Sequence, residues 1–453
     1  IVTISYRQTI YAYPNGGGAY IVARDNLGEL PAQVAGAALL TDYILTLAVS
    51  ISAGVEQITS GFQGLLPYKV EIAVAVIILM TIVNLRGVKE SGRIFAVPTY
   101  FFLSTMFLTL GIGFFRYFTG SLGTVTGVET IEHTVLAPLT LFLILRAFSS
   151  GCTALTGIEA ISNGITAFKE PRSHNAAVTL MWMSGILITL FVGITFLGHQ
   201  MSVQPSEVET VISQMGRTIF GDGSPFWYLL LAGTALILLM AANTSYADFP
   251  RLAALHAGDG FLPRQLTYRG SRLVFSWGIM VLAGAAIILV VVAGANTTAL
   301  IPLYAVGVFL SFTISQTGMV VRLHKIGKMK PGEVVQGLET TIEYDKNWRG
   351  KQIISALGAV STFIVMLIFA ITKFASGAWF VVLLIPILVF AFFRVHYHYK
   401  DVAHVLSLEG ARPEIDKRTV RTLILVDDVH AETARMVNFA KSLGHPWQAV
   451  HIG

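Results

Sequence analysis

Residues 145–163 read LRAFSSGCTALTGIEAISN and lie inside the apolar stretch Pro138–Phe168. The whole stretch is long enough to cross a bilayer as a helix, yet small and polar residues fill its middle. Gly151 and Gly157 permit the helix to unwind there. An unwound backbone exposes free carbonyl and amide groups, which a membrane tolerates only beside a cavity. The stretch therefore predicts an interrupted membrane helix that lines a cavity.

The rest of the chain has the composition of a polytopic membrane protein. Of its 453 residues, 54% are hydrophobic and 13% are charged, and the mean hydropathy is +0.67. Soluble domains carry about a quarter charged residues, so this composition excludes an ordinary soluble enzyme. Apolar runs of membrane-spanning length predict ten complete spans. They are Val34–Ile58, Val70–Leu85, Ile94–Phe118, Pro138–Phe168, Ala176–Leu197, Phe226–Ala242, Val274–Gly294, Ala299–Val321, Ile353–Ile371 and Gly377–Phe393, and Ile1–Tyr6 predicts the end of one more.

Basic residues are distributed unequally between the alternate loops of this arrangement. One set of loops carries nineteen Lys and Arg residues and the other set carries four, which are Lys69, Arg116, Arg217 and Lys373. Loops rich in Lys and Arg face the cytoplasm in membrane proteins. The bias therefore predicts that the first set of loops, and the C-terminus with them, is cytoplasmic.

The composition changes near residue 400, which predicts a transporter-like membrane domain over residues 1–399 and a polar linker over residues 400–418. The run Thr419–Val426 and the run Trp447–Ile452 are typical of strands, and Ala431–Leu443 has a helical pattern. Strand, helix and strand in this order predict the start of a cytoplasmic α/β domain.

Ionisable residues inside membrane spans usually face a cavity or a partner. The candidates for such a role are Asp42, Glu56, Arg146 and Glu159. Asp42 lies one turn before Thr46, and the spacing of Tyr43, Thr46 and Ser50 places three hydroxyls on one stripe of a helix. A stripe of hydroxyls beside a carboxylate favours contact with a substrate, whereas hydroxyl-mediated helix packing is the alternative.

The interrupted helix offers a second group of oxygens. Thr156, Glu159 and free backbone carbonyls near Gly157 would suit a hard cation, and the carboxylate could also carry a proton. The alternative is an ion pair between Glu159 and Arg146, but 13 residues of unbroken helix would separate them by about 20 Å. The glycine-rich segment Tyr11–Tyr20 lacks the Gly-Lys-Ser/Thr ending of a phosphate-binding loop, which favours a turn packed against helices.

The chain lacks the sequence patterns of several other functional classes. Cys152 is the one cysteine, which excludes a disulfide framework and a cysteine-based metal site. No set of nucleophile, histidine and aspartate points to an enzyme. We expect no cofactor and no nucleic-acid partner.

Several motifs together resemble one family. They are Tyr6–Tyr13, Pro14–Tyr20, Asp42–Gly54, Ala147–Asn163, Phe168–Pro171 before Asn175, Ala241–Thr244, Ile301–Val308 and Ser315–Gly318. The chain resembles the amino acid–polyamine–organocation (APC) superfamily of secondary transporters, and within it the KimA-type potassium importers of bacteria.

The resemblance implies an all-α polytopic membrane protein with the APC/LeuT-type inverted-repeat fold, followed by a cytoplasmic domain like the universal stress proteins. It implies twelve membrane helices, of which the first and most of the second would precede this sequence. It also implies potassium uptake with protons across a prokaryotic plasma membrane, by a homodimer that cyclic di-AMP regulates. The implied cation site consists of Asp42, Tyr43, Thr46, Ser50, Thr156, Glu159 and Tyr304, with potassium held by Tyr43, Thr46, Thr156 and Glu159.

Two other functions stay open at this point. One is an amino acid or polyamine permease of the same superfamily. The other is a membrane sensor that transports nothing and reports a small ligand through its C-terminal domain. A carboxylate and a hydroxyl stripe favour a cation, because free helix amides usually bind the carboxylate of an amino acid.

Overall fold

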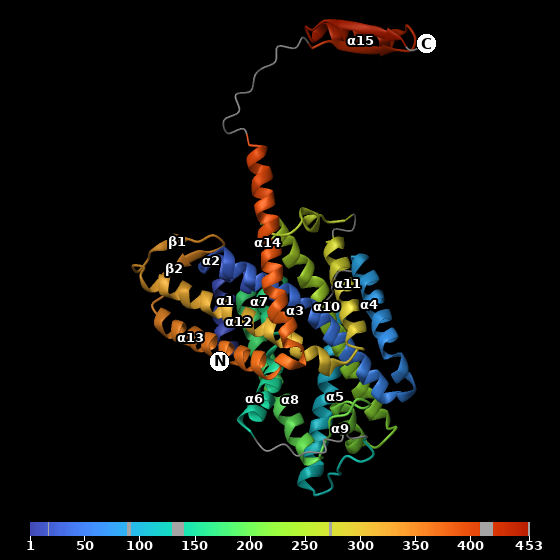
Figure 1. The fold of residues 1–453 in the computed structure, drawn as a ribbon, viewed down its shortest axis with the longest axis vertical. Helices are drawn as coiled ribbons and strands as arrows, with labels where there is room; N and C mark the ends of the chain where they lie inside the picture. The colour runs from blue at the N-terminus through green and yellow to red at the C-terminus, as the bar shows by residue number, and fades with distance from the viewer. Residues whose placement is uncertain (17, 88–91, 129–139, 271–273, 408–419, 452–453) are drawn as a thin grey trace. The chain divides into compact units, whose positions relative to one another are not determined.

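A computed structural model describes residues 1–16, 18–87, 92–128, 140–270, 274–407 and 420–451. The chain divides into two compact units, Ile1–His398 and Tyr399–Gly453. The first unit holds a bundle of helices and one hairpin (Figure 1). Its elements are α1 (Val2–Ala12), α2 (Ala19–Asn26), α3 (Glu29–Gly61), α4 (Lys69–Leu85), α5 (Gly92–Phe118), α6 (Leu141–Cys152), α7 (Ile158–Asn163), α8 (Arg172–Gln200), α9 (Val211–Phe220), α10 (Pro225–Gly258), α11 (Ser276–Val292), α12 (Thr297–Gly327), β1 (Val334–Gln336), β2 (Thr341–Glu343), α13 (Trp348–Thr372) and α14 (Trp379–Val405), which crosses into the second unit.

The predicted membrane spans are helices in the structure. Within the described residues, nine helical stretches are long and apolar enough to cross a membrane. The tenth predicted span, Val274–Gly294, corresponds to the shorter apolar helix α11 of 17 residues. The chain is therefore a multi-pass membrane protein, and the large apolar side chains exposed on its helices suit contact with lipid.

Two helices extend well beyond the predicted spans. The span predicted to end at Ala242 continues as α10 to Gly258, so that boundary was wrong. Polar residues between Asn243 and Asp248 lower the local hydropathy, although they occupy a helix. The last helix, α14, continues to Val405 and so enters the stretch predicted as a linker from residue 400. Residues 408–418 of that stretch lie outside the described part of the chain.

Two sets of helices repeat one order of lengths. The short helices α2 and α9 precede long helices of 33 and 34 residues, α3 and α10. Each long helix is followed by a helix of 17 residues, α4 or α11, and then by another long helix, α5 or α12. The packing repeats as well. Helix α12 packs against α3, and in the same way α5 packs against α10. The two long helices α3 and α10 also pack against each other. In the most apolar part of α3, 67% of the residues are buried. This high share reflects the central position of the helix.

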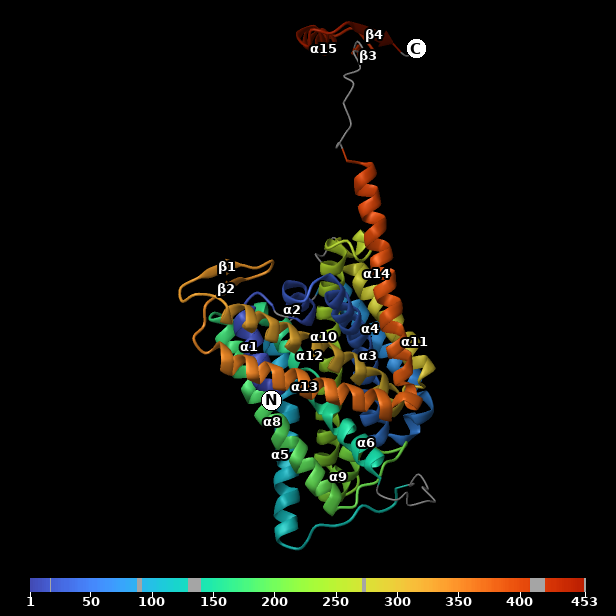
Figure 2. The ribbon, with the colours of Figure 1, turned by 60° about the vertical axis from the view of Figure 1, so that its left-hand side comes forward.

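The antiparallel hairpin β1–β2 joins α12 to α13 and lies beside α2 (Figure 2). Its one buried residue, Ile342, packs with Leu323 and Ile326 of α12. The hairpin is thereby fixed against the end of α12.

The second unit contains a strand, a helix and a strand. They are β3 (Thr422–Val426), α15 (Ala431–Ser442) and β4 (Trp447–His451), and the two strands are parallel. This arrangement confirms the order of elements predicted for residues 419–453 within the described residues.

Candidate functional site

The helix interruption predicted between residues 145 and 163 is confirmed. Helix α6 ends at Cys152, a 3-10 turn covers Thr153–Leu155, and α7 begins at Ile158. Between them Thr156 is extended, and Gly157 has a φ of 91°, which lies in the left-handed region. A side chain at residue 157 would meet no atom within 4 Å, so the backbone conformation and not crowding requires glycine.

Glu159 lies in the first turn of α7, and its side chain connects three segments. The residue is 6% exposed. Its Oε1 accepts the backbone N–H of Ala19 at 3.1 Å, and its Oε2 accepts the hydroxyl of Ser311 on α12 at 2.8 Å. Both carboxylate oxygens thus have partners other than Arg146, which is exposed. The structure does not support an ion pair between Glu159 and Arg146.

A cavity of about 50 Å³ lies beside Glu159. Its walls come from α3, α7, α10 and α12 and include five of the seven predicted site residues. These are Asp42, Tyr43, Thr46, Glu159 and Tyr304, and the other lining residues are Leu39, Gly157, Ala160, Asn163, Thr244, Asp248, Val308 and Phe312.

Hydrogen bonds position the polar side chains of this cavity. The Thr46 hydroxyl donates to Asp42 Oδ1 at 3.4 Å, which is the pair expected from their spacing on α3. The Asn163 amide donates to the Tyr43 hydroxyl at 2.7 Å. The wall residues of α3 and α7 are therefore linked across the cavity.

Two predicted residues, Ser50 and Thr156, are not among the cavity-lining residues. Ser50 is buried on α3, one turn beyond Thr46. The Thr156 hydroxyl donates to the Thr153 carbonyl at 2.8 Å, although it also lies within reach of the Tyr304 hydroxyl. The structure places both residues next to the lining residues.

Sequence reasoning missed Ala19, Asn163, Asp248 and Ser311. The glycine-rich segment was expected to be a packed turn, and it does pack closely: a Cβ at Gly18 would lie 2.4 Å from Asn163 Oδ1. It also brings the Ala19 N–H to Glu159, and no sequence pattern marks a single backbone amide. Asp248 was missed because the predicted span stopped at Ala242.

The cavity is strongly acidic. Asp42, Glu159 and Asp248 line it, and the lining contains no Lys or Arg among the described residues. Asp248 and Glu159 line the same cavity, so their carboxylates repel one another when both are ionised. The described residues nevertheless contain no cluster of three or more His, Cys, Asp or Glu that could hold a metal ion as a chelate. Separated carboxylates among hydroxyls suit a monovalent cation that needs several oxygens and modest charge.

Glu56, the other acidic residue of α3, has a different role. Its Oε1 accepts the backbone N–H of Thr297 at 3.0 Å, at the first residue of α12. A carboxylate at this position stabilises the start of a helix. Glu56 is a helix-capping residue outside the cavity.

Comparisons with known proteins agree on a class of transporters. The amino acid permease family matches residues 1–393. The potassium transporter KimA of Bacillus subtilis (strain 168) is 45% identical over 453 residues, a match that covers 99% of this chain and 70% of the relative.

Proposed function

This chain belongs to the amino acid permease family, which is a family of transporters and not of enzymes, and we propose that it imports potassium together with protons across a prokaryotic plasma membrane. The observation that carries the proposal is the small acidic cavity at the helix break. Buried carboxylates and hydroxyls at such a break are typical of cation sites in secondary transporters. The 45% identical relative is a potassium transporter by name.

In this proposal, oxygens from α3, from α7 and from the helix break before α7 replace part of the water shell of potassium. Tyr43 and Thr46 of α3, Glu159 of α7 and Thr156 before it contact the ion, while Asp42, Ser50 and Tyr304 complete the site. Glu159 supplies the charge, since an ionised carboxylate attracts a cation strongly where water is excluded. One of the cavity carboxylates carries the transported proton.

The size of the cavity argues against an amino acid or a polyamine as the cargo. A cavity of about 50 Å³ has room for about four water molecules, because one water needs roughly 10–15 Å³ by the same measure. Glycine already has five non-hydrogen atoms and a polyamine has more. The acidic lining would also repel the carboxylate of an amino acid.

We propose the APC/LeuT-type inverted-repeat fold for the membrane domain. Two observations support it. The order of helix lengths is repeated, and the last helix of each set packs against the first long helix of the other set, as α12 does on α3 and α5 on α10. In such folds the substrate site lies near the middle of the membrane at the interface of the repeats. The contribution of both α3 and α10, one helix from each proposed repeat, to the cavity wall supports this proposal.

The function is tested by uptake into proteoliposomes that contain the full-length protein. Radioactive rubidium, as a tracer for potassium, should accumulate when an inward proton gradient is imposed, and unlabelled potassium should compete with it. A panel of amino acids and polyamines should neither compete nor accumulate. Accumulation of a panel member without rubidium uptake would contradict the proposal and favour a permease.

We also propose the remaining domain organisation on the basis of the family resemblance. The membrane domain covers residues 1–399 and a linker follows over residues 400–418. The β-α-β unit from residue 419 begins a universal-stress-protein-like domain, which would be cytoplasmic by the distribution of Lys and Arg. The complete protein would be a homodimer that cyclic di-AMP inhibits.

Removal of everything after Lys400 from the otherwise complete protein should abolish inhibition by cyclic di-AMP and leave transport active. The reason is that the proposed nucleotide-binding domain begins after this point. The measurement is rubidium uptake with and without cyclic di-AMP inside the vesicles. Unchanged inhibition of the truncated protein would place the nucleotide site in the membrane domain.

A further inference from the structure

Helix α2 contacts the cation cavity at one end and the β1–β2 hairpin at the other. At its first residue, the Ala19 N–H donates to Glu159 Oε1 at 3.1 Å. Near its last residue, Asp25 Oδ1 accepts the backbone N–H groups of Leu338 at 2.9 Å and Glu339 at 3.4 Å, between the two strands. Eight helical residues span about 12 Å. A short rigid element therefore joins the cavity to the hairpin.

Asp25 is the centre of the contacts at the hairpin end. Its Oδ2 lies 3.1 Å from Nη1 of Arg322 on α12, and the two side chains are 1% and 4% exposed. The Tyr13 hydroxyl donates to the same oxygen at 3.0 Å. Burial raises the pKa of Tyr13 to about 12, so the phenol keeps its proton at neutral pH. A buried charge whose partner is removed destabilises the arrangement strongly, so Asp25 and Arg322 depend on each other.

Arg322 extends the connection into the hairpin. Its guanidinium donates to the Thr340 hydroxyl at 2.7 Å and to the Thr341 carbonyl at 3.2 Å. The hairpin is therefore bonded to Asp25 directly and to its partner Arg322 as well.

Arg24 makes a second set of contacts, which is less buried. Its Nη1 lies 2.7 Å from Asp259 just after α10 and 3.4 Å from Glu339 of the hairpin. The Tyr20 hydroxyl donates to the same Asp259 oxygen at 2.7 Å. Helix α2 thus holds together the hairpin, the end of α10 and α12.

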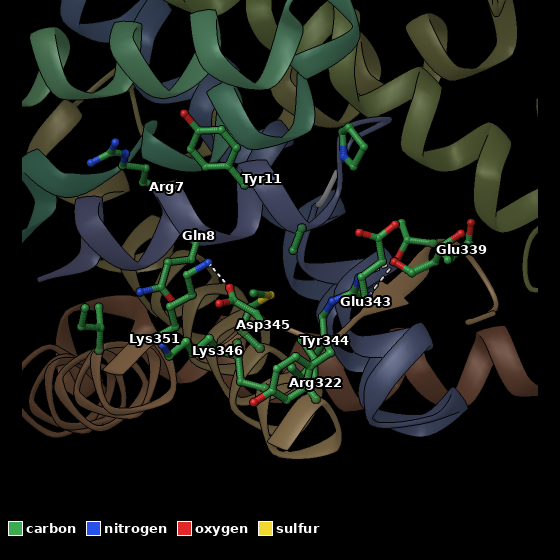
Figure 3. Close-up of a pocket in the computed structure, with 18 of the residues that line it drawn as sticks. Arg7, Gln8, Tyr11, Arg322, Glu339, Glu343, Tyr344, Asp345, Lys346 and Lys351 are labelled. Carbon is green, nitrogen blue, oxygen red and sulfur yellow. Dashed lines mark hydrogen bonds and ion pairs between the residues drawn. The ribbon is translucent and has the colours of Figure 1, made fainter. Parts of the chain in front are cut away.

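The hairpin has open space on one side. Arg322 and Glu339 line a cavity of about 1020 Å³, with Arg7 and Tyr11 on α1 and Lys351 on α13 among its other walls (Figure 3). The hairpin can move into this space without displacing a packed helix. Its described contacts with the rest of the molecule include those to α2, the hydrogen bonds from Arg322 of α12 and the packing of Ile342 on α12.

We propose that α2 couples cation binding at Glu159 to opening of the hairpin face of the protein. The inference rests on the proposed function, because it takes Glu159 as the residue that binds the transported cation. The start of a helix carries a partial positive charge, which stabilises the Glu159 carboxylate in the empty site. A bound cation competes for that carboxylate and weakens its contact with Ala19. Helix α2 then moves, the contacts of Arg24 and Asp25 break, and the cation leaves on the hairpin side.

The test uses a cysteine reporter in the full-length protein. Leu39 lines the cation cavity from α3 and is only 2% exposed, so Leu39→Cys in a Cys152→Ser background reports access to the cavity. A membrane-impermeant thiol reagent is applied to proteoliposomes from the hairpin side or from the opposite side, with and without potassium. We expect potassium to raise labelling from the hairpin side several-fold. Asp25→Asn should give the high labelling rate without potassium, because it removes the charge that holds Arg322.

Two further variants separate coupling from a loss of folding. Arg24→Gln leaves the buried Asp25–Arg322 pair intact and should raise potassium-free labelling in the same direction. Arg7→Gln removes a positive charge from the wall of the same large cavity, at a residue of α1, and should leave the labelling rate unchanged. If the unmodified protein takes up rubidium but neither α2 variant changes the labelling from the hairpin side, the coupling is overturned. Absence of rubidium uptake by the unmodified protein overturns the proposed function instead. Increased labelling from the opposite side alone contradicts opening of the hairpin face and so overturns the coupling as well.

Discussion

Glu159→Gln in the full-length protein is expected to abolish proton-driven potassium uptake while the protein still inserts into the membrane. Glutamine keeps an oxygen for the Ala19 N–H and an amide that can donate to Ser311, so the local contacts persist. It removes the charge that attracts the cation and the group that can take a proton. One charge pair at 4 Å is worth roughly 4 kcal/mol at an effective dielectric constant of 20, or about a thousand-fold in affinity. Rubidium uptake and potassium competition measure the effect.

Glu56→Gln is the matched control for this prediction. Glu56 also accepts the N–H of the first residue of another helix, yet it lies outside the cavity. Glutamine can keep this hydrogen bond too, so uptake and apparent potassium affinity should stay close to those of the unmodified protein. Normal uptake by Glu159→Gln would remove Glu159 from the cation site. Equal loss in both variants would mean that the effect comes from helix capping.

Gly36→Ala is expected to destabilise the packing of α3 on α10 severely. A Cβ at residue 36 would lie 2.0 Å and 2.2 Å from the His256 ring atoms Cε1 and Nε2. The ring cannot turn away, because Tyr20 packs on it at 4.0 Å and Phe392 at 5.5 Å between ring centroids. Overpacking of a buried contact costs about 1–3 kcal/mol. Thermal unfolding in detergent, followed by the loss of monodisperse protein, measures the effect.

Gly111→Ala in α5 serves as the control for Gly36→Ala. A Cβ at Gly111 meets nothing within 4 Å, and alanine is favoured over glycine inside a helix by about 1 kcal/mol. Its stability should be unchanged or higher. In a His256→Ala background, Gly36→Ala should cost nothing further, since the ring it would strike is gone. A large cost in that background would show that the stability loss has another origin.

The membrane spans and the helix break were predictable because each depends on residues close together in the chain. Apolar runs mark the spans, and Gly157 next to Thr156 and Glu159 marks the interruption. The length of α10 was not predictable by hydropathy, because Asp248 and Thr244 are polar and face a cavity inside the bundle. Mean hydropathy is averaged over a window of residues. It therefore gives the same low value for polar residues that face a cavity within a helix as for polar residues in a loop.

The structure gathers five of the seven predicted site residues around one cavity, together with neighbours that the sequence did not mark. The stripe on α3 brought Asp42, Tyr43 and Thr46 to the cavity, since helical spacing fixes their common face. The partners of Glu159 could not be derived in this way. Ala19 contributes a backbone amide, and Ser311 comes from a helix 152 residues later in the chain.

These long separations have a consequence for how the protein is made. The hydrogen bond of Glu56 can form only after Thr297 is synthesised, 241 residues later. The hydrogen bond between Glu159 and Ser311 likewise requires synthesis of α12. Until α12 enters the membrane, the halves of the bundle hold carboxylates that lack their final hydrogen-bond donors. A buried acceptor without its donor is costly in lipid. A nascent chain that stops before residue 297 therefore holds carboxylate oxygens within the bilayer without these donors.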